Sequence, residues 1–379
     1  MSNADVKKAV VIDNGSHTCK VGFAGDDAPR HVCPAVVSRP CDDDAMAGVN
    51  GKYTYVGREE PSRRESLIFS HPVENGIVVN WEEMENLWRH VLTKVMAINN
   101  EEHPLLLTEA PFNSTTNRER MTEIVFETLK TPSFYVAVQP VLALYASGRT
   151  TGVVIDAGED VTHVVSIYEG YILPHACERL NVAGRKLTDN LRRLLAERGY
   201  DLQSSAQREI VQAIKEDLCY IALDFEQTIE ASTKSTNIEK AYKLPDGKQI
   251  TINSERFRAP EALFRPSLIN EENAGLHKLV HNSIMKINIE IRNSFYQNVI
   301  LAGGSTMFPG FQDRIQKELT SLATADTKID VIAPKDQKYS AGRGGSILTS
   351  LEAFPSQTMW ISKREYEECG PSIVHRKCF

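Results

Sequence analysis

The amino-acid sequence predicts an α/β protein of two domains, and three observations support this fold class. The chain has 379 residues, which is too long for one ordinary hydrophobic core. Apolar runs of strand length alternate along it with helical patterns. A strand-turn-strand pattern near the N-terminus occurs again near the middle of the chain, which indicates a duplicated unit. We therefore expect two similar halves that face each other across a cleft.

Composition restricts the class of protein. Hydrophobic residues make up 41% of the chain and no apolar run is long enough to span a bilayer, so we expect a soluble protein without membrane insertion or a secretory leader. The formal net charge of −7 argues against direct nucleic-acid binding. Seven cysteines without close pairing predict reduced thiols of the cytosol or nucleus. Cys33 and Cys41 lack the partner spacing of a zinc site.

The first strand-turn-strand pattern lies at Ala9–Gly25. Three apolar residues run into Asp13, the turn Asn14-Gly15-Ser16 follows, and an alternating run returns through Val21. Asn-Gly is a strong hairpin signal, and successive backbone N–H groups in such a turn form a concavity for phosphate. An aspartate beside it has the chemistry to hold hydrated Mg²⁺. Taken alone, the stretch is more typical of an ordinary hairpin, because short motifs of this kind often occur without a ligand.

The second pattern, Thr151–Gly170, repeats the first. Val153-Val154-Ile155-Asp156 precedes Ala157-Gly158, as Val10-Val11-Ile12-Asp13 precedes Asn14-Gly15. Two such hairpins predict a polyphosphate held between the halves, with a divalent cation between Asp13 and Asp156.

The rest of the first half predicts further strands and helices. Ala24–Pro34 is typical of a turn-rich segment. Cys41–Gly51 is typical of an exposed loop whose three aspartates lack the spacing of a calcium site. The expected elements are a short strand at Ala35–Val37, a helix capped by Asn80, a strand at Leu105–Leu107, a helix opened by Thr116 and Glu119, and a strand at Tyr135–Val138. Gln139 follows this last strand, where either a place in the cleft or a satisfied edge amide fits.

The second half begins after a linker at Ser147–Gly152. Its expected elements are helices at Gly184–Arg198, Ser204–Phe225 and Leu276–Ile291, a hairpin at Tyr242–Ile252, and a strand at Asn298–Ala302. Lys215 and Glu216 lie off the apolar stripe of the second helix, where solvated charges are usual. Gly303-Gly304-Ser305-Thr306 follows the strand, which is a third arrangement typical of phosphate or ribose binding.

The chain resembles actins along its whole length. The matching segments include Val21–Arg30, Leu106–Pro111, Leu144–Gly152, Tyr168–Tyr171 and Gly370–Phe379. The resemblance implies the actin and sugar-kinase type ATPase fold, with two similar lobes that each contain a mixed five-stranded sheet flanked by helices. It places residues 1–147 and 339–379 in the first lobe, with an insertion at about 35–70. Residues 148–338 form the second lobe, with an insertion at about 183–273.

The resemblance also implies a site for ATP or ADP with Mg²⁺ or Ca²⁺. Asp13 and Asp156 would hold the cation through water, and Gln139 and His163 would orient the attacking water. The residues assigned to the nucleotide are Gly15, Ser16, Lys20, Gly158, Glu159, Gly184, Lys215, Glu216, Gly304, Ser305, Met307, Phe308 and Lys338. Partner proteins are expected at a groove of Tyr145, Gly148, Thr150, Tyr171, Leu348 and Leu351.

Departures from the family pattern qualify these expectations. A bulky His17 follows the first serine, Ala157 lacks a hydroxyl, and Asp160 brings a charge that would repel a triphosphate unless it is compensated. Phe308 replaces the usual tyrosine and Gln212 an arginine. We therefore expect nucleotide binding with slow or impaired ATP hydrolysis.

The chain also departs from the family pattern at positions related to filament assembly. The altered positions are Asp5, Asp42-Asp43-Asp44, Asn75, Leu268–Glu271, Gly342-Arg343 and the stretch Pro355–Thr358. The expected function is an ATP-binding cytoskeletal protein of the cytoplasm that forms filaments or joins other actin-like subunits. The alternative is a non-polymerising subunit of a motor or chromatin complex, in which case a nuclear location also fits. A small-molecule kinase lacks support, because no sugar-site constellation is present.

Overall fold

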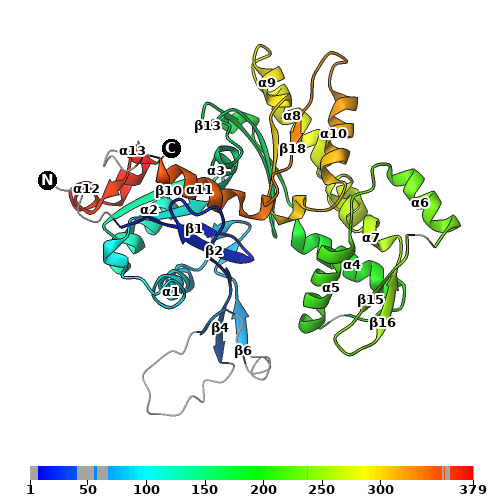
Figure 1. The fold of residues 1–379 in the computed structure, drawn as a ribbon, viewed down its shortest axis with the longest axis horizontal. Helices are drawn as coiled ribbons and strands as arrows, with labels where there is room; N and C mark the ends of the chain where they lie inside the picture. Colours follow the sequence, from blue (N-terminus) through cyan, green and yellow to red (C-terminus); the bar gives the residue numbers. More distant parts are fainter. Residues whose placement is uncertain are drawn as a thin grey trace. The chain divides into compact units, whose positions relative to one another are not determined.

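The computed structural model describes residues 7–40, 55–57, 67–202, 204–236, 238–351, 354 and 359–378. The chain divides into two compact units, which are Met1–Arg149 with Tyr339–Phe379, and Thr150–Lys338 (Figure 1). The expected loop at Cys41–Gly51 and the altered stretches at Asp5 and Pro355–Thr358 lie outside the described residues.

The first unit is built on a mixed sheet. Among the described residues its strand order is β19-β10-β9-β1-β2-β3. The central strand β1 pairs antiparallel with β2 and parallel with β9, and β10 continues the parallel part. The strands are β1 (Val10–Asn14), β2 (Thr18–Phe23), β3 (His31–Pro34), β9 (Leu105–Glu109), β10 (Ser133–Val138) and β19 (Ile361–Ser362). All five residues of β1 are buried, as is typical of a central strand covered on both faces.

Helices cover this sheet. Trp88, Met84 and Leu87 of α1 are fully buried in the same core as Leu105–Leu107 of β9. Figure 1 shows α11 beside α3, and α11 also contacts β1 and β9. The α-helices are α1 (Trp81–His90), α2 (Thr115–Glu123), α3 (Gln139–Ala146), α11 (Ser340–Ser350), α12 (Lys363–Cys369) and α13 (Val374–Lys377). Smaller strands are β4 (Val37–Pro40), β5 (Tyr55–Val56), β6 (Leu67–Ser70), β7 (Val73–Glu74) and β8 (Ile77–Val78).

The second unit repeats the arrangement. In its described sheet the order is β13-β12-β11-β17-β18, and β14 also pairs with β12. β11 pairs antiparallel with β12 and parallel with β17, as β1 does with β2 and β9. The strands are β11 (Gly152–Ala157), β12 (Thr162–Tyr168), β13 (Tyr171–Ile172), β14 (Glu178–Leu180), β17 (Val299–Ala302) and β18 (Val331–Ile332). Each described sheet has the expected five strands and one further short strand, which is β19 in the first unit and β14 in the second.

Helices and a hairpin complete the second unit. The expected hairpin forms from β15 (Lys240–Lys243) and β16 (Gln249–Ile252). Figure 1 shows it on the side of the unit where α5, α6 and α7 lie. The α-helices are α4 (Gly184–Glu197), α5 (Ser205–Leu218), α6 (Phe225–Lys234), α7 (Glu255–Arg258), α8 (Leu276–Met285), α9 (Arg292–Tyr296) and α10 (Phe311–Leu322).

Three helices differ from the sequence prediction. α2 is capped by Ser114, whose side chain accepts from the Asn117 N–H, so the predicted start at Thr116 is wrong. α5 keeps its predicted capping box at Ser204 but ends at Leu218. Beyond it the Tyr220 N–H donates to the Arg256 carbonyl at 3.1 Å and the Ile221 N–H to the Pro309 carbonyl at 2.8 Å, so tertiary hydrogen bonds replace the next helical ones. α8 ends at Met285, short of the predicted end at Ile291.

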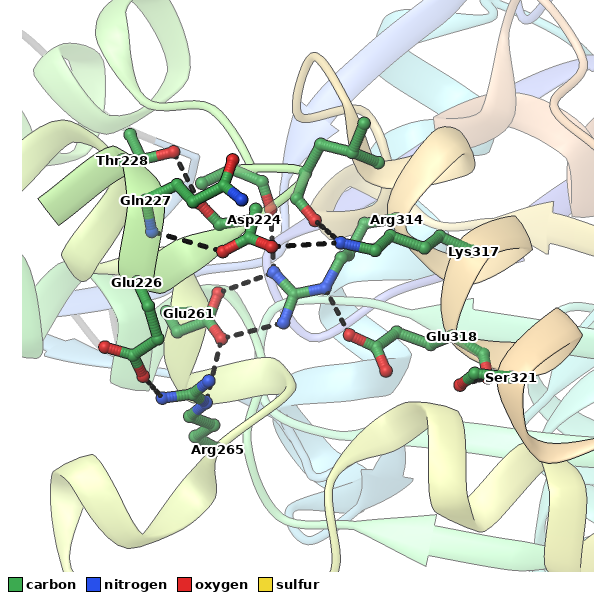
Figure 2. Close-up of polar contacts among 12 residues, drawn as sticks. Asp224, Glu226, Gln227, Thr228, Glu261, Arg265, Arg314, Lys317, Glu318 and Ser321 are labelled. Atoms are coloured by element: carbon green, nitrogen blue, oxygen red, sulfur yellow. Dashed lines mark hydrogen bonds and ion pairs between the residues drawn. The ribbon is translucent and has the colours of Figure 1, made fainter. Parts of the chain in front are cut away.

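A buried ion pair joins α10 to the short 3₁₀ segment Pro260–Leu263 in the second unit (Figure 2). The Arg314 guanidinium donates to both Glu261 oxygens, at 3.1 and 3.2 Å, and Glu261 is fully buried. Arg314 also donates to the Ala222 carbonyl at 2.7 Å and to Glu318 at 2.6 Å. Because these charges are buried, their stability depends on each keeping its partners.

Replacing Glu261 by Gln should therefore destabilise the protein by about 3 kcal/mol, since a buried guanidinium loses its principal counter-charge. Denaturant unfolding followed by circular dichroism measures this loss. Glu197→Gln is the control, because it breaks an ion pair with Arg193 whose side chains are both about half exposed, and no measurable change is expected there. Equal midpoints for the two variants would contradict the assigned role of the pair.

Candidate functional site

Each unit contains a hairpin turn of the same construction, and each of these turns is described by itself as a candidate site. We call residues 14–18 the first turn and residues 157–161 the second turn. The Gly15 N–H donates to the Thr18 carbonyl at 3.2 Å, and the Gly158 N–H donates to the Val161 carbonyl at 3.1 Å. Asp13 stands two residues before the first glycine, and Asp156 two residues before the second. The duplicated sequence pattern therefore folds into duplicated geometry.

Asp13 is a buried carboxylate whose oxygens are both engaged. Its Oδ2 lies 3.0 Å from Lys20 Nζ, on the neighbouring strand β2. Its Oδ1 accepts from Thr108 Oγ1 at 2.8 Å and from Gln139 Nε2 at 3.0 Å. Only 2% of Asp13 is exposed. These three donors replace the water that burial removes and keep the carboxylate in one orientation.

A buried polar network holds the start of the first turn. Asn14 donates from its backbone to Thr108 Oγ1 and from its side chain to the Thr108 carbonyl, both at 2.9 Å. The Trp88 indole donates to Asn14 Oδ1 at 2.9 Å, and Ser16 Oγ accepts from the Gly76 N–H at 3.1 Å. Sequence reasoning missed Thr108 and Trp88. The only signal for Thr108 is its place at the end of a buried strand.

Gln139 is placed by the end of β10 and the start of α3. Its Nε2 donates to the Asn14 carbonyl at 2.7 Å as well as to Asp13. Its Oε1 accepts no hydrogen bond from the described part of the chain. The side chain is therefore a support for Asp13 whose oxygen remains available to water.

The second turn packs against the glycine turn that follows β17. Gly303 has φ of +84°, and a Cβ there would lie 2.3 Å from the Ala157 carbonyl oxygen and 2.8 Å from Asp156 Oδ1. Only glycine permits this backbone and this approach. The third glycine-rich stretch of the sequence thus lies beside the second turn, within the same unit.

His163 stands opposite Asp156 across the hairpin, as Lys20 stands opposite Asp13. His163 is 5% exposed. Burial, with a smaller effect of the Arg179 charge, lowers its pKa from 6.5 to about 4. His163 is therefore neutral near pH 7, so it acts there as a hydrogen-bonding group without a charge.

The first residues of α4 hold the second turn. The Gly158 carbonyl accepts from the Gly184 N–H at 3.1 Å and from Ser305 Oγ at 2.7 Å. The Glu159 carbonyl accepts from the Arg185 N–H at 2.7 Å. A Cβ at Gly184 would lie 2.6 Å from a Glu159 carboxylate oxygen, so a larger residue there would displace the Glu159 side chain. The structure thus brings together four predicted residues, Gly158, Glu159, Gly184 and Ser305.

The charge of Asp160 is compensated. Arg185 Nε lies 2.6 Å from Asp160 Oδ1, and the Asp160 side chain is only 8% exposed. The sequence indicated repulsion of a triphosphate unless geometry compensates, and this ion pair is the compensation. Arg185 was not among the predicted residues, because nothing in its local sequence relates it to a turn 25 positions earlier.

Lys215 and Glu216 occupy different environments. Lys215 is 4% exposed and donates to the Gly184 carbonyl at 3.0 Å and to Thr188 Oγ1 at 2.9 Å. Burial lowers its pKa. The sequence position favoured a solvated charge, but Lys215 is buried because the start of α4 approaches this side of α5 and offers it the Gly184 carbonyl and the Thr188 hydroxyl as acceptors. Glu216 is exposed and accepts from Gln212 at 2.9 Å.

The other predicted residues lie in both units. Gly304, Ser305, Met307 and Phe308 follow β17, and Met307 is 43% exposed whereas Phe308 is buried. Lys338 ends the second unit. Of the groove residues, Tyr145, Gly148, Leu348 and Leu351 belong to the first unit, and Thr150 and Tyr171 to the second. Leu351 and Tyr171 are exposed.

Comparison with known proteins identifies the family. A family model described as Actin matches residues 4–379, which is nearly the whole chain. None of the described helices is both long and apolar enough to cross a membrane. The described residues also contain no cluster of three or more His, Cys, Asp or Glu side chains with the arrangement of a metal site.

The depressed pKa of His163 predicts a dependence of stability on pH. The unfolded chain binds a proton at this residue near pH 6.5 and the folded protein only near pH 4, so this residue's contribution is complete above 6.5 and is lost as pH falls to 4. The loss amounts to about 3 kcal/mol. In His163→Gln the free energy of unfolding, measured in urea at pH 7.5, 6 and 5, should fall less steeply than in the wild type. If the free energy of unfolding fell equally with pH in both proteins, the low pKa assigned to His163 would be contradicted.

Proposed function

Because the chain belongs to the actin family, we propose that it binds ATP or ADP through the first and second turns. The observation that supports this is the equal construction of the two turns, each closed by a glycine N–H and each preceded by an aspartate at the end of a central strand. Fold alone does not imply function, so the proposal rests on these residues as well as on the family.

The phosphates are assigned to the turn backbones and to Gly15, Ser16, Lys20, Gly158 and Glu159. Consecutive amides in a tight turn attract anions, and Ser16 has a hydroxyl hydrogen to donate while its oxygen accepts from Gly76. Lys20 supplies a cation at the end of the turn, although part of its charge is balanced by Asp13. The phosphate contacts therefore depend on backbone geometry more than on net charge.

A divalent cation, Mg²⁺ or Ca²⁺, fits this chemistry through water. Asp13 is engaged by three protein donors, so it suits hydrogen bonding to the waters of a hydrated ion better than direct coordination. Asp156 has the equivalent place in the second turn. When bound, the cation supplies charge neutralisation to the phosphates.

Ribose and adenine are assigned to the residues after β17 with Lys338 and Glu216. Met307 offers exposed apolar surface, and Gly304 has open space where a side chain would stand. Lys215 acts indirectly in this proposal, because its ammonium holds the Gly184 carbonyl.

Hydrolysis is proposed to be slow. Gln139 Oε1 and neutral His163 are able to orient a water molecule, but neither is a strong base. Phosphoryl transfer relies chiefly on position and electrostatics, so a small change in the second turn such as Ala157 acts on the rate more than on binding.

Nucleotide binding predicts that freshly purified protein releases ATP or ADP when it is denatured, and that ATP with Mg²⁺ raises its melting temperature. Asp156→Asn should weaken Mg²⁺-dependent binding at least about tenfold and slow phosphate release, because a carboxylate is lost beside the phosphates. The control is Asp246→Asn, at an exposed hairpin tip of the same unit. Two results together would contradict the proposed function: the denatured protein releases no nucleotide, and its melting temperature does not change when nucleotide and metal are added.

Self-association follows from the family, and we propose filaments or mixed assemblies of actin-like subunits in the cytoplasm. The groove residues around Leu351 and Tyr171 are proposed to receive actin-binding proteins, because they present exposed apolar surface.

One observation favours the alternative of a non-polymerising subunit. In the Leu268–Glu271 segment, Glu271 forms an ion pair with Lys186 of α4, in its own unit. Asn270 adopts a left-handed conformation with φ of +59°, which turns the chain back after the 3₁₀ segment Pro266–Ile269. A segment bound to its own unit is less available to a neighbour, as suits a subunit of a fixed complex in the cytoplasm or nucleus.

Sedimentation distinguishes the two functions. Filament formation predicts a pellet after addition of salt, Mg²⁺ and ATP, followed by slow phosphate release. The matched variant Lys186→Gln removes the ion pair with Glu271 and should increase the pellet if that contact restrains assembly. A protein that binds nucleotide but stays in the supernatant at all concentrations would support the fixed-complex subunit.

A further inference from the structure

The second turn contains a charged side chain that is paired within its own unit. Asp160 and Arg185 meet at 2.6 Å, with Asp160 nearly buried and Arg185 about one third exposed. Arg185 is the second residue of α4, a helix of 14 residues. The pair therefore links the outer part of the turn to the start of a long helix.

The backbone fixes both partners. The Arg185 N–H donates to the Glu159 carbonyl at 2.7 Å, and the adjacent Gly184 N–H donates to the Gly158 carbonyl at 3.1 Å. Because these bonds join the two segments beside each partner, the backbones that carry the guanidinium and the carboxylate are held close together. An ion pair between groups already fixed costs little side-chain entropy.

The first turn has a different residue at the equivalent position. Asp160 lies four residues after Asp156, and His17 lies four residues after Asp13. The second turn thus has two consecutive carboxylates, Glu159 and Asp160, where the first has Ser16 and His17. Without Arg185 the second turn would present an excess negative charge.

We propose that Arg185 is a positioning residue that neutralises Asp160 and thereby allows the second turn to accept a triphosphate. This inference rests on the proposed nucleotide binding and adds a determinant of selectivity between triphosphate and diphosphate. Arg185 acts through Asp160, and no contact of its own with the nucleotide is required.

Coulomb repulsion gives the direction of the effect. An uncompensated Asp160 would oppose ATP more than ADP, because ATP has the additional γ-phosphate charge. Loss of a merely structural contact would weaken both nucleotides to the same extent. The ratio of the two affinities therefore separates an electrostatic role from a structural one.

The experiment compares dissociation constants of Mg-ATP and Mg-ADP, measured with a fluorescent nucleotide displaced by each. Arg185→Gln should weaken ATP about tenfold more than ADP. Asp160→Asn should shift the ratio the other way, towards ATP. The double variant should return to nearly the wild-type ratio, because both charges are then absent. Melting temperatures without nucleotide show whether each variant is folded.

Arg193→Gln is the matched control. It removes the same charge from the same helix, at an ion pair with Glu197 that is half exposed, and should leave the ratio unchanged. Equal losses for ATP and ADP in Arg185→Gln, or no recovery in the double variant, would overturn this inference and leave nucleotide binding standing. A wild-type protein that binds neither nucleotide would overturn both.

Discussion

Each unit must place a carboxylate at the end of a buried central strand, and this constraint governs much of the structure around it. A buried carboxylate is costly unless donors replace its water. At Asp13 the donors come from Lys20 on the neighbouring strand, Thr108 on the parallel strand and Gln139 at the start of α3. Three separate elements are thereby held to one another by a single side chain. The proposed binding of phosphates and a hydrated cation rests on this arrangement.

In the second unit the turn after Asp156 is held by close backbone packing. Gly303 brings the segment after β17 against the second turn at a distance that a side chain would prevent, and the Gly184 N–H bonds the second turn to the start of α4. Lys215 then satisfies the Gly184 carbonyl from the far side. Substitutions in the turn itself, such as Asp160, are tolerated because the adjacent helix supplies Arg185. The charge that Asp160 adds to the second turn is therefore balanced within the same unit.

Several parts of the site followed from sequence reasoning. The repeated Val-Val-Ile-Asp-X-Gly pattern predicted both turns and the place of Asp13 and Asp156, because an apolar strand followed by a glycine turn is determined over a few residues. The caps at Asn80 and Ser204 were likewise found, since a cap and its partner lie three residues apart. The supports of the site were not. Thr108 and Arg185 act on residues far away in the chain, and although the glycine turn at Gly303 was predicted, its contact with the second turn was not. The end of α5 likewise depends on distant contacts with Arg256 and Pro309.

The sequence by itself determined the family, the duplicated α/β architecture and the two aspartate-tipped hairpins, because these depend on local periodicity and on motifs spread along the whole chain. Only the tertiary structure decided the state of individual side chains. It made Lys215 a buried donor, gave His163 a low pKa, engaged Gln139 with Asp13 and paired Asp160 with Arg185. The physical reason is that burial and charge compensation depend on which residues meet in space, and local patterns do not contain that information.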